Sequence, residues 1–117
     1  MDIFEKALNE ISKEYPVRRT TVNYAQIELD ELFDWHNYIF IGVFYRKDTN
    51  QVILTDNADY APLCEWEEEN LPEVESICKK HNITFSDWYI ECIYQSNQDV
   101  KNYLECLREL SEKYAEL

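Results

Sequence analysis

The sequence predicts an α+β domain in which helices cover one face of an antiparallel sheet of about five strands. Apolar residues recur at helical spacing at both ends of the chain, and short alternating or continuous apolar runs lie between them. Strands and helices do not alternate regularly, as they would in a parallel sheet, so we expect the order α-β-β-β-α-β-β-α. A chain of 117 residues with 45 % hydrophobic residues is suited to one domain, residues 1–117.

The first helix is expected over residues 2–15, where apolar side chains recur every three or four positions. Asp2 and Glu5 form a capping-box pattern at its start, and Pro16 stops it. The capping pattern and the apolar spacing agree, so this helix can be predicted from its own residues alone.

Three strands are expected next. Residues 17–29 alternate apolar and polar side chains, with a change of phase near Ala25 that we interpret as a β-bulge. Residues 35–45 contain a nearly continuous apolar run, which is typical of a central strand. Turn-forming residues 47–50 then lead into an antiparallel partner over residues 51–55.

The second half of the chain predicts a helix, a hairpin and a longer helix. Pro72 lies in the first turn of a helix that ends near His81. Residues 83–85 and 88–94 flank a Ser-Asp turn and are expected to pair. From Asn97 an apolar stripe at helical spacing continues almost to the end of the chain.

The sequence also predicts a soluble, cytoplasmic protein. It has no long apolar run of the kind that spans a membrane, and its opening residues do not form a signal peptide. The four cysteines are Cys64, Cys78, Cys92 and Cys106. We expect free thiols, because the compartment is reducing. Their even spacing of 14 residues is interpreted as chance, since they fall on at least three different elements.

Charge is the most unusual feature of the composition. The chain carries 24 acidic and 11 basic residues, which gives a net charge of −13. Residues 28–75, here called the acidic stretch, hold 13 of the acids and only two bases, Arg46 and Lys47, and so contribute −11. Within it, residues 56–70 are expected to form an acidic loop. Such a field repels nucleic acid and anionic membranes and attracts basic surfaces.

The acidic stretch is therefore interpreted in two ways. It is either a solvated face of an acidic protein or a surface that binds lysine and arginine side chains of a partner protein. For the binding surface, tryptophan and tyrosine among the acids are candidate anchors. The residues predicted to contact the partner are Glu28, Asp30, Glu31, Asp34, Trp35, Asp56, Asp59, Tyr60, Glu65, Trp66, Glu67, Glu68 and Glu69.

No catalytic motif is recognisable, and no cofactor is predicted. Neither histidine stands in a motif with a serine or cysteine nucleophile. The single glycine, Gly42, excludes the glycine-rich loops that cradle phosphates. Asp34, His36 and Asp56 could together hold a metal ion only if the fold brought them together. We therefore expect no enzyme, and keep a metal-dependent nuclease or hydrolase built on these three residues as an alternative.

One pair of motifs resembles a known family. The segment from Phe33 to Asn37, Phe-Asp-Trp-His-Asn, enters a strand, and Leu54-Thr55-Asp56 closes the next strand. Both motifs resemble the prophage-associated domain of unknown function 1828 family, although this chain has Asn57-Ala58 where that family has a glycine. The resemblance implies a phage or mobile-element setting and no known activity.

In that setting, a small acidic domain without catalytic residues resembles anti-defence inhibitors of the anti-CRISPR or anti-restriction type. Carboxylates at near-phosphate density compete for the lysines and arginines that neutralise a DNA backbone, so such a protein would act as a DNA mimic. An immunity protein that neutralises a basic toxin nuclease would use the same electrostatics, and it stays open as an alternative.

Overall fold

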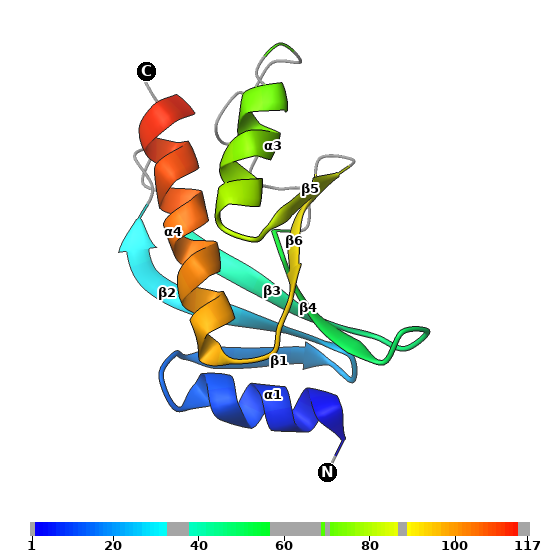
Figure 1. The fold of residues 1–117 in the computed structure, drawn as a ribbon. Coiled ribbons are helices and arrows are strands. Elements are labelled where there is room, and N and C mark those ends of the chain that lie inside the picture. The colour runs from blue at the N-terminus through cyan, green and yellow to red at the C-terminus, as the bar shows by residue number, and fades with distance from the viewer. Residues whose placement is uncertain (1, 33–37, 57–68, 70, 87–88, 115–117) are drawn as a thin grey trace.

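The structure is a computed structural model, which describes residues 2–32, 38–56, 69, 71–86 and 89–114. Within these ranges the chain forms, in order, α1 (Ile3–Ser12), β1 (Val17–Thr21), β2 (Tyr24–Leu32), β3 (Tyr38–Arg46), β4 (Gln51–Thr55), α3 (Leu71–Lys80), β5 (Thr84–Ser86), β6 (Tyr89–Ile93) and α4 (Asn97–Tyr114). The strands make one antiparallel sheet in the order β1-β2-β3-β4-β6-β5. Figure 1 shows α1 beside the start of α4, and α3 alongside the later turns of α4. The predicted α+β class is confirmed.

The one difference in element order lies in the segment predicted as a single bulged strand over residues 17–29. It is two strands, β1 and β2, joined by a tight turn at Val22 and Asn23. The Thr21 hydroxyl donates to Asn23 Oδ1 at 2.9 Å, and the Arg19 guanidinium donates to the carbonyl oxygen of Val22 at 3.0 Å. The change of phase in the apolar pattern therefore marks a chain reversal, and the predicted single strand is wrong; the pairing of β1 with β2 does shift register between Arg19 and Thr21, next to Ala25.

The core lies between one face of the sheet and helices α1, α3 and α4. The strand register places Ala25, Val43 and Leu54 side by side across β2, β3 and β4, and all three are fully buried. Because side chains alternate between the faces of a strand, the neighbouring residues point to the opposite face. Apolar residues of α1, α3 and α4 join the first face in one cluster, so the helices cover one face, as predicted.

Helix α1 is fixed at both ends. Asp2 accepts a hydrogen bond from the Glu5 backbone N–H at 2.8 Å, which confirms the predicted N-cap. The Glu5 side chain pairs with Arg19 of β1, and the Arg19 guanidinium lies 5.3 Å from the centroid of the Phe4 ring. The helix ends at Ser12, a turn earlier than predicted, and its last carbonyls bond to the residues that follow.

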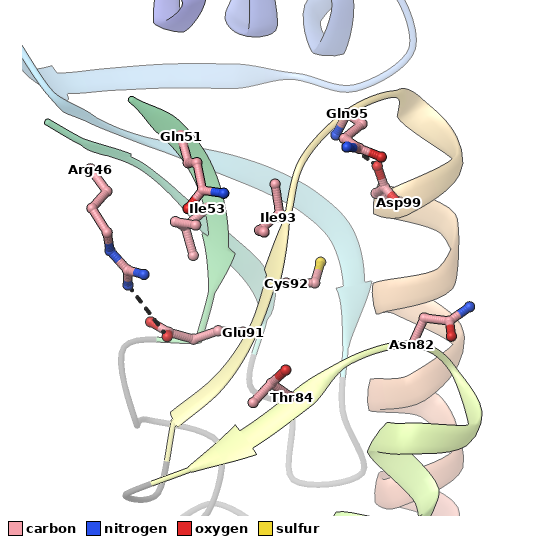
Figure 2. A pocket seen from close by; sticks show the side chains of 10 residues that line it. All are labelled: Arg46, Gln51, Ile53, Asn82, Thr84, Glu91, Cys92, Ile93, Gln95 and Asp99. Carbon is pink, nitrogen blue, oxygen red and sulfur yellow. Dashed lines mark hydrogen bonds and ion pairs between the residues drawn. The ribbon is translucent and has the colours of Figure 1, made fainter. Parts of the chain in front are cut away.

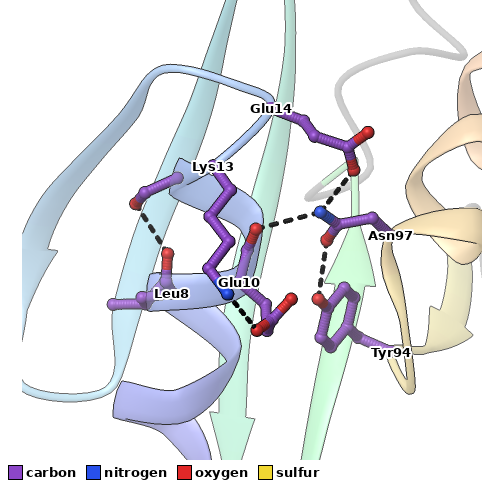
Figure 3. Close-up of polar contacts among 7 residues, drawn as sticks. Leu8, Glu10, Lys13, Glu14, Tyr94 and Asn97 are labelled. Carbon is purple, nitrogen blue, oxygen red and sulfur yellow. Dashed lines mark hydrogen bonds and ion pairs between the residues drawn. The ribbon is translucent and has the colours of Figure 1, made fainter.

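Asn97 joins the end of α1 to the start of α4, although 87 residues separate it from Glu10. Its side-chain N–H₂ donates to the Glu10 carbonyl oxygen at 2.9 Å and to the Glu14 carboxylate at 2.5 Å, as Figure 3 shows. The Tyr94 hydroxyl donates to Asn97 Oδ1 at 2.7 Å. Burial, reinforced by nearby carboxylates, raises the pKa of Tyr94 to about 12, so this hydroxyl keeps its proton.

Candidate functional site

The predicted partner-binding residues fall into three groups. For Glu28, Asp56 and Glu69 the structure describes both the position and the burial. For Asp30 and Glu31 it describes only their position on β2. The remaining predicted contacts, Asp34, Trp35, Asp59, Tyr60, Glu65, Trp66, Glu67 and Glu68, lie outside the described residues, as does His36. What the structure shows of the candidate surface therefore rests on the acids around β2, β4 and α3.

Glu28 lies on the sheet face opposite the helices. Its carboxylate is 3.5 Å from the Arg18 guanidinium of β1, and the two side chains are 50 % and 70 % exposed. A pair this exposed contributes little to stability, about 0–1 kcal/mol. Arg18 comes from outside the acidic stretch, so the fold neutralises part of the charge at this position.

Three more acids of the stretch gather at the start of α3. Glu69 precedes the helix, Glu73 lies in its first turn, and Glu75 follows; all three are exposed. Glu73 pairs with Lys113 of α4. No ion pair joins Glu69 or Glu75 to another residue that the structure describes. Acids near a helix N-terminus are favoured by the helix dipole, so this cluster is compatible with a stable α3.

A hollow of about 570 Å³ opens beside β4 and β6 (Figure 2). Ile93 lines it and is 45 % exposed. The charged groups that line the hollow already have partners within the chain. Arg46 lies 3.6 Å from Glu91, and Asp99 accepts the Gln95 backbone N–H at 2.7 Å. Glu91 lies outside the acidic stretch. Arg46, one of the two bases within the stretch, therefore pairs with an acid outside it.

Asp56 has a structural place in the interior. It is 5 % exposed, and its Oδ1 accepts the backbone N–H of Ile90 at 3.0 Å. Strand β4 ends at Thr55, which pairs with Glu91 of β6, so position 56 stands opposite Ile90. The buried hydroxyl of Tyr103, on α4, donates to the Ile90 carbonyl oxygen at 2.6 Å. Beyond Thr55, β4 no longer provides main-chain hydrogen-bond partners for β6. The side chains of Asp56 and Tyr103 take their place at Ile90.

The prediction that Asp56 contacts a partner is therefore wrong, because a buried carboxylate bonded to the neighbouring strand cannot lie on a binding surface. The sequence shows an acid directly after a strand, and it does not show that Ile90, 34 residues later, needs an acceptor there. Among the described residues, no group of three or more His, Cys, Asp or Glu side chains is arranged to hold a metal ion.

The prediction that the cysteines lie on at least three different elements is confirmed by the three cysteines that the structure describes. Cys78, Cys92 and Cys106 lie on α3, β6 and α4, as different elements, and all three are free thiols. The Cys106 thiol nevertheless meets the Cys78 sulfur at 3.8 Å in the interior. That contact, with burial, holds the pKa of Cys106 well above its ordinary value. Burial likewise raises the pKa of Cys92 to about 12, with Asp99 and Glu91 adding to the effect.

No described helix is both long enough and apolar enough to cross a membrane.

Comparison with known proteins provides no relative: no family model, no curated protein and no solved structure matches the chain. The proposal of function therefore rests on the charges and contacts of the chain itself, and only its biological setting rests on the resemblance of two short motifs.

Proposed function

We propose that this protein is a non-enzymatic acidic inhibitor that binds a basic nucleic-acid-binding protein and occupies its nucleic-acid surface. One observation carries the proposal: the acidic stretch holds 13 acids against two bases. A folded domain does not need so one-sided a field for solubility, and the field attracts basic surfaces. The setting implied by the family resemblance makes a phage or mobile-element anti-defence inhibitor our first choice of class.

The ion pairs of the structure identify which acids are available to a partner. Glu28 and Glu73 each have a base from outside the stretch. Glu69 and Glu75 are exposed, and no ion pair joins either to another described residue. At these two acids, and at Asp48 in the turn between β3 and β4, a partner's lysine or arginine would replace water rather than a described ion-pair partner. Glu69 directly follows the acidic run of residues 65–68 in sequence.

The test compares two charge reversals of equal size. Glu69→Lys with Glu75→Lys changes the acidic stretch, and Glu105→Lys with Glu112→Lys makes the same change in net charge on exposed positions of α4. Binding is measured to purified basic defence nucleases, with and without their DNA. We expect the first variant to weaken binding about tenfold or more and the second to have little effect, because close charge pairs determine affinity locally.

Salt and competitor DNA provide the second readout. Affinity of the unaltered protein should fall steeply between about 50 and 200 mM salt, and DNA should displace it. Equal losses in both variants, or binding that salt leaves unchanged, would reduce the acidic stretch to a solvated face. Binding confined to a toxin nuclease would select the immunity protein instead. Nuclease turnover by the protein with Mg²⁺, lost in Asp34→Ala, would show an enzyme.

A further inference from the structure

Two buried thiols meet where α3 packs against α4. Cys78 and Cys106 are both fully buried, their sulfur atoms are 3.8 Å apart, and 28 residues of chain separate them. They belong to the same apolar cluster as Val74 and Leu107, so the helices are already in contact at this level. Neither thiol takes part in the proposed function.

The two sulfur atoms are already in contact, so a covalent bond between them needs only a short approach. A disulfide has a sulfur–sulfur length of about 2.05 Å, so the two atoms must approach by about 1.8 Å. Rotation of two cysteine side chains can share that movement. Cys92 on β6 is the third cysteine that the structure describes, and it is the alternative partner that the test must exclude.

We propose that Cys78 and Cys106 are an oxidisable pair, which a peroxide converts in the folded protein to a disulfide that joins α3 to α4. This property is independent of the proposed inhibitor function.

The reaction balances with hydrogen peroxide as the oxidant. One cysteine, as the thiolate, attacks a peroxide oxygen; the O–O bond breaks, and the departing hydroxide takes up a proton to give water and a sulfenic acid. The other cysteine then attacks the sulfenic sulfur, the S–S bond forms, and a second water leaves with the remaining thiol proton. Two thiols lose two electrons and two protons in total, and one peroxide becomes two waters.

The environment makes the first step slow and the second step fast. The pKa of Cys106 is held high by its contact with Cys78 and by burial, so little thiolate is present. Once a sulfenic acid forms, the second sulfur is already beside it and water is excluded. The pair should therefore pass to the disulfide rather than to higher oxides, over hours rather than seconds.

A protease that cuts after glutamate makes the test direct, because it places each cysteine in a separate fragment: 32–65, 76–91, 92–105 and 106–109. The reduced, folded protein is treated with hydrogen peroxide, blocked with an alkylating reagent and digested. We expect fragments 76–91 and 106–109 to be joined, with the loss of two hydrogen atoms and recovery of both fragments on reduction. The oxidised protein should melt about 10 °C higher than the reduced protein, because the disulfide closes a long loop.

Cys92→Ser is the control, since this half-buried position keeps the pair intact. The variant should still form the link at the rate of the unaltered protein. Three results would overturn the proposal: oxidation of both cysteines to sulfinic acids with no link, a link that forms only in denaturant, or a link that disappears in Cys92→Ser.

Discussion

Two sets of polar side chains, those beside Ile90 in the interior and the exposed acids at the start of α3, have opposite surroundings, although Asp56 of the first set also belongs to the acidic stretch. In the interior, Asp56 and Tyr103 each bond to the main chain of Ile90, at the point where β4 ends. In the acidic stretch, Glu69 and Glu75 are exposed, and no described residue forms an ion pair with either. The first pair supplies hydrogen bonds in the interior, whereas the second pair stays exposed without a described ion pair, which is why the second pair is a candidate for binding.

The largest effect on stability that follows from this comparison is expected at Asp56. Asp56→Ala removes the acceptor for the Ile90 N–H, which stays buried, and an unsatisfied buried donor costs about 1–3 kcal/mol. The free energy of unfolding, measured by urea denaturation, should fall by that amount. Asp48→Ala, in the exposed turn between β3 and β4, is the matched loss of an aspartate. Equal stability of the two variants would contradict the structural role of Asp56.

Much of the fold could be predicted from local pattern. The order of elements, the N-cap at Asp2 and the hairpin of β3 and β4 follow from periodicity and turn residues that lie close together in sequence. The reversal at Val22 and Asn23 was missed because the turn contains no glycine or proline, and a change of phase alone also fits a bulge.

The roles of Asp56 and the cysteines could not be predicted, because each depends on a partner far along the chain. Asp56 has the composition of a surface acid, and only its place opposite Ile90 gives it a buried function. Cys78 and Cys106 meet because α3 and α4 pack together, which no spacing in the sequence states. Most of the predicted partner surface lies outside the described residues, so it stays a prediction.

An intermediate effect is expected at Glu109 of α4, where hydrogen bonds from Lys80 at 2.6 Å and from His81 at 2.9 Å lower the carboxyl pKa below 4.5. A carboxyl group whose pKa is lower in the folded chain than in the unfolded chain stabilises the fold at pH values above its unfolded-state pKa. This contribution is lost as the pH falls through the folded-state pKa. The side chain is about one-third exposed, so solvent screening limits the contribution to a few tenths of a kcal/mol, at most about 1.

The measurement compares Glu109→Gln with the unaltered protein by urea denaturation from about pH 7 to about pH 3. The variant should be less stable near neutral pH, and the difference should shrink at the acid end. Glu105→Gln, one turn earlier on α4 and exposed, is the control. A difference that grows with acid would reverse the sign of the linkage and contradict the lowered pKa.

The smallest effect on stability is expected where the proposed function needs the largest effect on binding. Glu69→Gln with Glu75→Gln removes two exposed charges from the start of α3, and exposed substitutions usually change stability by less than about 0.5 kcal/mol. Two opposing contributions are involved: loss of favourable interaction with the helix dipole destabilises α3, and relief of repulsion within the acidic stretch stabilises the fold. Both weaken as salt rises, so the free energy of unfolding should stay close to that of the unaltered protein at about 0.15 M salt. Thermal and urea denaturation of the variant test this directly. A loss above about 1 kcal/mol would show that these acids hold the fold together, and any loss of binding in the corresponding lysine variant would then reflect damaged structure instead of a missing contact.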